Sequence, residues 1–283
     1  MSSRENTSLY IADPGGSCTP SGAGNVDVVG LTTAAFTGAV PVGVNPVSLA
    51  ETPNGSKIYV ANKGDNSVTV INAVDHTVKT VITVNMGMAP NYVVASADSA
   101  CVYVANQASD SISVINTTSD AVASTVTLPA GSGPTFLAFD SHLQRVYSAN
   151  TTGNSISALN HNSTCVLPAL PLKTEPLIGG LAPRSIAPLA DGTRVYVANS
   201  GSNSVSVIDA SSLTLKTFPN PSSPNAIPVG ANPVSIAAAP DSSRVYVANH
   251  DSGNISIIQT GNDTELSRLP ASSPNPTFVL VTP

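Results

Sequence analysis

The stretch RVYVANSGSNSVSVID, residues 194–209, occurs five times in this chain in close variants. The other copies are KIYVANKGDNSVTVIN from Lys57, CVYVANQASDSISVIN from Cys101, RVYSANTTGNSISALN from Arg145 and RVYVANHDSGNISIIQ from Arg244. A sixth, degenerate copy, SLYIAD, contains Tyr10. The five copies recur every 44 to 50 residues. A period of roughly 20 to 50 residues is typical of solenoids, arrays and propellers, so the content of one period decides among them.

Each period holds four short segments of the β type, separated by turn residues. The first follows a proline, as in NPVSIA (232–237), and the second is the YVAN segment. The third alternates Val or Ile with Ser or Thr, and the fourth is variable, as in TVKTVITV (77–84). No helical periodicity of useful length is present. Four antiparallel strands per period, named A to D from the axis outward, predict the blade of an all-β propeller.

The two ends of the chain predict how the ring closes. Strand A recurs at Pro46, Pro90, Pro134, Pro183, Pro233 and Pro276. The last copy has no YVAN segment after it, and the first YVAN-like segment has no strand A before it. We expect residues 276–283 to complete the first blade, because closure pairs strand edges that would otherwise stay open. The chain is then one six-bladed domain, 1–283, with blades at 4–42 plus 276–283, 45–85, 89–129, 133–175, 182–225 and 232–270.

Composition excludes several classes of partner. The net charge is −6 and charged residues are 10% of the 283, with no basic stripe, which disfavours nucleic acid and anionic membranes. No apolar run is long enough to span a membrane. The start, MSSRENTSLY, lacks the pattern of a signal peptide. Low charge and richness in Ser, Thr and Asn favour an extracytoplasmic location, whether secreted, periplasmic or on the cell surface, and we expect a monomer.

The three cysteines, Cys18, Cys101 and Cys165, form an odd set without a CxxC pair. They cannot all pair within one chain, and we interpret them as buried or incidental thiols.

The repeated words resemble a known family. YVAN followed by NSVSVID is similar to the YVTN-type β-propeller repeats of surface-layer-like proteins, and the resemblance covers nearly the whole chain. It implies the propeller fold. Related propellers include binding modules, lactonases and oxidoreductase domains, so the resemblance implies no single activity. Many lactonase-like relatives have seven blades, whereas six are expected here.

Residues present in every copy are assigned to the scaffold, and a single site is expected among residues that break the repeat. The five asparagines that end the YVAN segments, Asn62, Asn106, Asn150, Asn199 and Asn249, are therefore structural, and we expect them to bond to turn backbone. The resemblance places ligands at the face formed by the B–C and D–A loops. Repeat-breaking residues predicted to bind ligand there are Lys63, Asp65, Asn91, Tyr92, Gln107, Asp110, Arg184 and His250. A longer B–C loop, residues 13–25, carries Cys18 on the same face.

Arg184 stands where the other copies have Val, Asn or Thr, and a guanidinium suits a carboxylate or phosphate. His250 with Asp251 could supply acid–base chemistry, which makes Arg184, His250 and Asp251 the catalytic candidates. No HExxH, GxSxG, GxGxxG or P-loop occurs.

No cofactor is expected from the sequence. A Ca²⁺ site built on the oxygens of Asn45, Asn232 and Asn275 is a weaker alternative, because hard cations prefer several carboxylates.

These residues leave two functions open. The leading hypothesis is a non-catalytic binding or cell-surface scaffold module that holds a protein or small ligand at the B–C/D–A face. The absence of Trp and the 4% aromatic content disfavour a sugar lectin that stacks on aromatic rings. The alternative is a hydrolase or lyase of lactonase type with its site at the mouth of the central channel.

Overall fold

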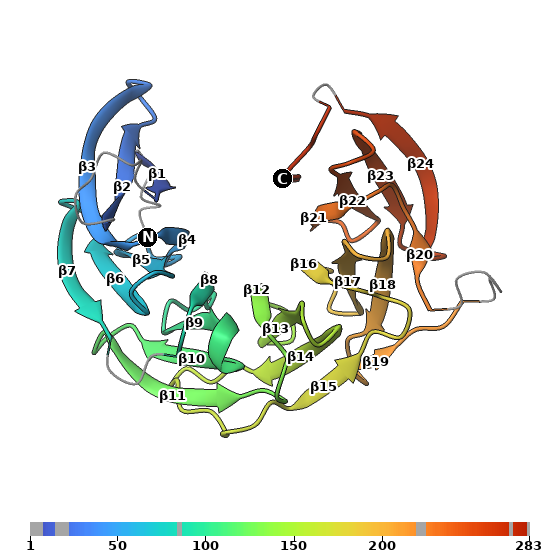
Figure 1. Ribbon diagram of the computed structural model, residues 1–283, viewed down its shortest axis with the longest axis horizontal. Helices are drawn as coiled ribbons and strands as arrows, with labels where there is room; N and C mark the ends of the chain where they lie inside the picture. Colours follow the sequence, from blue (N-terminus) through green and yellow to red (C-terminus); the bar gives the residue numbers. More distant parts are fainter. Residues whose placement is uncertain (1–7, 15–22, 84–86, 219–224, 272–273, 282–283) are drawn as a thin grey trace. The chain divides into compact units, whose positions relative to one another are not determined.

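The computed structural model describes residues 8–14, 23–83, 87–218, 225–271 and 274–281. The chain forms two compact units, residues 1–127 with 162–169 and residues 128–161 with 170–283. Both are built from antiparallel sheets of the propeller-blade type, drawn in Figure 1. Within the described part of the chain the single helical element is the 3-10 turn Gln107–Ser109, which is far too short to cross a membrane.

Unit 1 contains three sheets, and in each the strands pair in chain order from the innermost to the outermost. They are β1(Ser8–Asp13), β2(Ala23–Gly30) and β3(Ala35–Val44); β4(Pro46–Glu51), β5(Lys57–Asn62), β6(Ser67–Asn72) and β7(Thr77–Ile82); and β8(Pro90–Ala95), β9(Cys101–Asn106), β10(Ser111–Asn116) and β11(Ala121–Thr127).

Unit 2 contains the other three sheets of the described residues. They are β12(Pro134–Asp140), β13(Arg145–Asn150), β14(Ser155–Asn160) and β15(Lys173–Pro176); β16(Pro183–Pro188), β17(Arg194–Asn199), β18(Ser204–Asp209), β19(Thr214–Leu215) and β20(Ile227–Pro228); and β21(Pro233–Ala238), β22(Arg244–Asn249), β23(Asn254–Gln259) and β24(Thr264–Pro270).

The core lies between neighbouring sheets. The YVAN strands and the strands after them are buried along most of their length, because both of their faces meet a neighbouring sheet. In unit 2, Tyr196 and Val207 pack against Val245 and Val247 of the next sheet. In unit 1, Tyr59 and Val70 pack in the same way against Val102 and Val104. The β-branched residues of the repeated word thus form the contacts between sheets.

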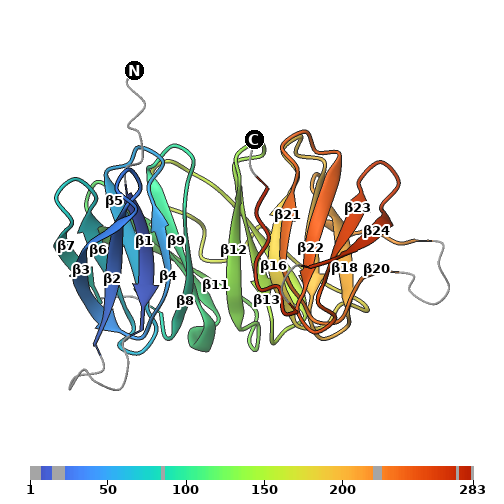
Figure 2. The same cartoon turned by 90° about the horizontal axis from the view of Figure 1, so that it is seen from above.

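The innermost strands lie side by side within each unit, as Figures 1 and 2 show for β12, β16 and β21. In three places a serine two residues after the opening proline bonds to the next inner segment. Ser48 accepts a hydrogen bond from the Val93 amide (3.2 Å), and Ser185 accepts one from the Ile236 amide (3.3 Å). Ser235 accepts the same bond from the Val279 amide (3.2 Å). Residues 276–281 therefore lie beside β21 in the register that a further inner strand would take.

The predicted closure is not observed as strand pairing. The first sheet has three strands rather than four, and residues 274–281 form no strand within the described residues. Annular closure by residues 276–283 stays a prediction, and residues 282–283 lie outside the described part.

The repeated asparagines are structural, but their bonding differs from the expected turn. Asn62 is fully buried, and its amide donates to Ser67 Oγ and Thr69 Oγ1, both at 2.9 Å. Asn106, Asn150 and Asn199 make the same two bonds to the hydroxyls five and seven residues on. Because the partners are side chains of the third strand rather than turn backbone, each Asn fixes the register of its hairpin.

A second repeated position lies in the turn between the third and fourth strands. One residue there is left-handed in five sheets, with φ between 52° and 62°. Each of these joint residues contacts the preceding sheet, but the chemistry differs from one to the next. The joint residues are His76, Asp120, Cys165, Leu213 and Asp263.

Two joint residues are buried carboxylates, and each forms ion pairs with two cationic side chains. Asp120 accepts hydrogen bonds from Tyr59 Oη (2.6 Å), Lys57 Nζ (2.8 Å) and Lys79 Nζ (2.6 Å). Asp263 repeats this arrangement with Tyr196, Arg194 and Lys216. His76 instead packs edge-on against the ring of Tyr10.

A disulfide between Cys101 and Cys165 corrects the interpretation of the cysteines as thiols. Cys101 begins β9, just as Lys57 begins β5, and Cys165 occupies the joint position held elsewhere by Asp120. A covalent bond thus replaces an ion cluster at one joint. Cys18 lies outside the described residues.

At the fourth joint residue, Leu213, no carboxylate is present to accept a hydrogen bond from the tyrosine of the preceding sheet. Tyr147, the counterpart of Tyr59, is fully buried in the apolar cluster that contains Leu213. Its hydroxyl has no hydrogen-bond partner among the described residues.

Candidate functional site

A β-bulge opens each of five innermost strands, which are β4, β8, β12, β16 and β21. Strand pairing skips one residue after the opening proline, for example between Pro183 and Ser185. A bulge redirects the side chain of the extra residue and is frequent beside functional sites. The bulge residues are Val47, Asn91, Thr135, Arg184 and Val234. Arg184, the most divergent residue of the repeat, thus occupies one of these five bulge positions.

A second set of divergent residues lies at the same end of each sheet. The opening proline pairs with the Asn that ends the second strand, so the residue after that Asn is adjacent to the bulge. These following residues are Lys63, Gln107, Thr151, Ser200 and His250. Sequence alone identified Lys63, Asn91, Gln107, Arg184 and His250 as candidates but missed Thr135, Thr151 and Ser200. Their place after the proline or the Asn was the available signal.

Three predicted residues come together in unit 1. Lys63 Nζ donates to Asn91 Oδ1 and to Gln107 Oε1, both at 2.9 Å, and so bridges two neighbouring sheets. The Lys63 amide also donates to Asn45 O (3.0 Å), and the Gln107 amide donates to Ala89 O (3.0 Å). These backbone bonds hold both side chains at the end of their strands.

The other predicted residues of unit 1 support loops. Asp65 accepts hydrogen bonds from the Val44 amide (3.0 Å) and from Ser67 Oγ (2.6 Å), so it holds the preceding D–A loop in place. Asp110 is left-handed, with φ of 47°, and ends the 3-10 turn. Burial raises the pKa of Tyr92, which keeps its hydroxyl protonated.

Unit 2 brings His250 and Asp251 together. His250 Nδ1 lies 2.6 Å from Asp251 Oδ1, and Asn232 Nδ2 donates to the same oxygen at 3.1 Å. The hydrogen bond from His250, and then that from Asn232, lower the pKa of Asp251, so the carboxylate is charged at neutral pH. A charged Asp251 holds the proton on Nδ1 and leaves Nε2 as the basic nitrogen.

Arg184 is exposed and makes no hydrogen bond or ion pair with any described residue. It lies on β16, directly beside β21, and precedes Ser185, which bonds to β21. Thr151 Oγ1 donates to Pro183 O (2.7 Å) and is hydrogen-bonded to Thr135 Oγ1. Arg184 therefore belongs to the sheet between that of Thr135 and Thr151 and that of His250, at the same end of the strands.

The residues of the calcium hypothesis are divided between the two units. Asn45 belongs to unit 1, and Asn232 and Asn275 belong to unit 2. Asn232 Nδ2 is already bonded to Asp251. No group of three His, Cys, Asp or Glu suited to a metal occurs within the described residues. The calcium site stays an untested prediction.

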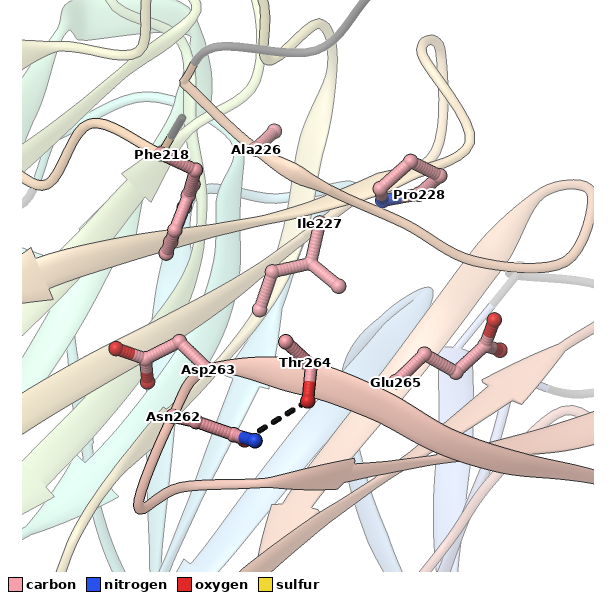
Figure 3. Close-up of a pocket in the computed structure, with 8 residues that line it drawn as sticks. All are labelled: Phe218, Ala226, Ile227, Pro228, Asn262, Asp263, Thr264 and Glu265. Atoms are coloured by element: carbon pink, nitrogen blue, oxygen red, sulfur yellow. Dashed lines mark hydrogen bonds between the residues drawn. The ribbon is translucent and has the colours of Figure 1, made fainter. Parts of the chain in front are cut away.

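A cavity of about 360 Å³ lies on the outer side of unit 2 and is shown in Figure 3. Phe218, Ile227 and Pro228 face Asn262, Asp263, Thr264 and Glu265 across it. Asp263 is engaged by two cations and a tyrosine, and Glu265 pairs with Arg268 (2.8 Å). Because its charged groups are paired, this cavity offers no acid–base group, and the face with Arg184 and His250 remains the better candidate.

Antiparallel blades with a divergent polar end define a protein of the β-propeller class. The sequence profile described as "Lactonase, 7-bladed beta-propeller" matches residues 26–123 and 116–281. The chain belongs to this family. Six sheets are present in the described residues, whereas the family description gives seven blades.

Solved structures confirm the fold. The periplasmic gluconolactonase PpgL of Pseudomonas aeruginosa is 18% identical with a TM-score of 0.70, over 97% of this chain and 85% of that one. A proposed 6-phosphogluconolactonase of Bacteroides uniformis is 17% identical with a TM-score of 0.71, over 95% and 84%. A protein of unknown function from Desulfotomaculum acetoxidans is 17% identical with a TM-score of 0.70, over 90% and 80%. No curated protein matches the sequence.

These findings correct the leading functional hypothesis. The expectation of a binding or cell-surface scaffold is wrong, because the family is one of lactonases and its structural neighbours include named lactonases. The lactonase-like part of the resemblance is confirmed, whereas its surface-layer-like part is not. The scaffold hypothesis rested on the regular repeat, and the repeated residues specify the blades rather than an activity.

Proposed function

We propose that this protein is a lactonase that hydrolyses the lactone of a sugar acid at the loop face that carries Arg184, His250 and Asp251. Membership of the lactonase family and the names of two structural neighbours support the reaction type. The observation that carries the assignment of residues is the 2.6 Å contact between His250 Nδ1 and Asp251 Oδ1, supported by Asn232.

In the proposed reaction, water attacks the lactone carbonyl while His250 Nε2 takes a proton from that water. Asp251 stabilises the imidazolium that forms, as a carboxylate does when it accepts from the opposite ring nitrogen. The tetrahedral intermediate then collapses, the bond between the carbonyl carbon and the ring oxygen breaks, and His250 returns the proton to that oxygen. One water is consumed and one hydroxy acid is formed.

Arg184 is assigned the developing negative charge or an anionic group of the substrate. Its guanidinium has no partner among the described residues, so a ligand would not have to displace an existing ion pair. An unpaired and exposed guanidinium binds a carboxylate or phosphate in two-point fashion. Thr151, which donates to the backbone oxygen of Pro183, and its partner Thr135 would add hydroxyls for a polyhydroxylated substrate.

The test is lactone hydrolysis by pH-stat, corrected for the spontaneous rate, with gluconolactone and 6-phosphogluconolactone as substrates. We expect His250→Gln to lower kcat about 100-fold, since general acid–base catalysis contributes roughly 10²–10⁴-fold. Arg184→Gln should lower kcat/KM about 10-fold, as expected for one lost charged hydrogen bond. Arg244→Gln is the matched control, because this exposed arginine begins β22, at the other end of the sheet. Unchanged hydrolysis in both site variants would remove the residue assignment.

The proposed location is outside the cytoplasm. The disulfide between Cys101 and Cys165 supports it, because such bonds persist mainly in oxidising compartments. The periplasmic location given in the name of the Pseudomonas neighbour is consistent with this proposal.

A further inference from the structure

A second polar pocket lies in unit 1 at the end of the sheet β4–β7 opposite Lys63. It has a volume of about 440 Å³ and is formed by the turns that flank β5 and β6 together with β7. Its lining residues are Asn54, Ser56, Lys57, Asn72, Val74 and Lys79. Two ammonium groups, two amides and a hydroxyl therefore face a volume large enough for a small polar molecule.

The lining has two cations, Lys57 and Lys79, and both pair with a single buried carboxylate, Asp120. Lys57 Nζ spends its donors on Thr117 O and on Asp120. Lys79 Nζ makes one ion pair, with Asp120 Oδ2 (2.6 Å), and its side chain is 47% exposed. An ammonium has three N–H donors, so Lys79 keeps two for another partner.

Asn54 adds a donor aimed away from its own turn. Its Oδ1 accepts hydrogen bonds from Thr52 Oγ1 (2.8 Å), the Ser56 amide (3.1 Å) and Ser56 Oγ (2.7 Å). Because these three donors fix the amide oxygen, Nδ2 points to the other side, where it has no partner among the described residues. Asn72 likewise turns Oδ1 toward the Val74 amide (3.1 Å).

An acidic residue next to the pocket, Asp75, accepts hydrogen bonds within its own turn. Asp75 Oδ1 accepts from the Thr77 amide (3.1 Å) and Thr77 Oγ1 (2.7 Å), and Oδ2 lies 3.3 Å from Asn72 Nδ2. Asp75 does not line the pocket.

The corresponding place in unit 2 is more acidic. Asp191 stands in place of Asn54, and its Oδ1 accepts from the Thr193 amide (2.9 Å) and Thr193 Oγ1 (2.7 Å). Asp209 stands in place of Asn72 and likewise accepts from its own turn. The two cations, Arg194 and Lys216, are retained around Asp263. The same frame thus carries two carboxylates in unit 2 where unit 1 has two amides, whereas unit 1 carries one carboxylate, Asp75, where unit 2 has Ser212.

We propose that the pocket at Asn54 and Lys79 binds the oxyanion, carboxylate or phosphate, of a small polar ligand. The amides supply donors where carboxylates would repel an anion, and Lys79 supplies the charge. This site lies on the end of the sheet away from Lys63, and it is independent of the proposed lactone hydrolysis.

The test is a titration of the ¹⁵N-labelled protein with inorganic phosphate and, separately, with acetate at low ionic strength, following the amide resonances of residues 54–57 and 79. We expect saturable shifts with at least one anion. Asn54→Asp and Lys79→Gln should each weaken binding at least 10-fold. Asn54→Asp preserves the turn, because Asp191 forms the same bonds in unit 2.

Lys216→Gln is the matched control, because it removes the equivalent lysine of unit 2 and should leave binding unchanged. Saturation by phosphate alone assigns a phosphate ligand, saturation by acetate alone assigns a carboxylate, and saturation by both assigns an oxyanion site that accepts either group. The proposal is overturned if neither anion shifts these resonances, if Asn54→Asp binds as tightly as the original protein, or if Lys216→Gln weakens binding equally.

Discussion

The joint residues allow one tyrosine hydroxyl to be tested with and without its partner. Tyr59 and Tyr147 occupy the same place in the repeat and are both 0% exposed. Tyr59 donates to the Asp120 carboxylate at 2.6 Å, whereas the Tyr147 hydroxyl has no hydrogen-bond partner among the described residues. The substitutions Tyr59→Phe and Tyr147→Phe therefore remove the same atom from two sites of equal burial.

The expected free energies of unfolding differ accordingly. A hydrogen bond to a charged group contributes about 1.5–3 kcal/mol, and Asp120 keeps Lys57 and Lys79 after the change, so Tyr59→Phe should cost about 2 kcal/mol. Tyr147→Phe removes a buried hydroxyl that donates to no described acceptor but interacts with the Arg145 guanidinium, so its cost should be smaller, about 1 kcal/mol or less. Burial raises the pKa of Tyr147, so no ionised form complicates the comparison near neutral pH.

The measurement is urea denaturation of both variants and the original protein, with the disulfide intact and the slopes of the transitions compared. A cost of about 2 kcal/mol for Tyr59→Phe beside about 1 kcal/mol or less for Tyr147→Phe supports the reasoning. Equal losses in the two variants would show that the acceptor is irrelevant, and a larger loss for Tyr147→Phe would refute the reasoning outright.

Two further perturbations address other joints. Replacing Cys101 and Cys165 by Ala should lower stability by about 2–4 kcal/mol, and dithiothreitol should destabilise the original protein but leave this variant unchanged in thermal melts. Burial raises the pKa of Asp120, but the hydrogen bonds from Lys57, Lys79 and Tyr59 outweigh it and hold the pKa below its usual value of 3.8. A depressed folded-state pKa contributes stability above the unfolded value that is lost as pH falls, so acid should destabilise the original protein more steeply than Asp120→Asn below about pH 5. Parallel curves of stability against pH would contradict this assignment.

The blades were predictable because their signal is repeated. Alternating Val or Ile with Ser, bounded by turns, specified the strands of the repeated word, and the buried asparagines were recognised as scaffold. Their hydroxyl partners could also have been found, since a Ser or Thr follows at five and seven residues in four of the copies, as with Ser67 and Thr69.

Other features were not predictable because they depend on contacts between repeats. The disulfide joins Cys101 and Cys165 at two different positions of the repeat, and only the packing of neighbouring sheets shows that these positions touch. The bulge at Arg184 is a property of strand pairing, which a Pro-x pair alone does not specify. The proposal of a lactonase rests on family membership rather than on any spacing of residues.

The five joints are held by an aromatic contact, an ion cluster, a disulfide, an apolar contact and a second ion cluster. Seams of such different chemistry respond to different solution variables. Acid weakens the joint at Asp120, a reductant opens the joint at Cys165, and neither acts on the joint at Leu213. We therefore expect the molecule to open at a different joint under acid than under a reductant. A single free energy of unfolding would not show which joint opens first.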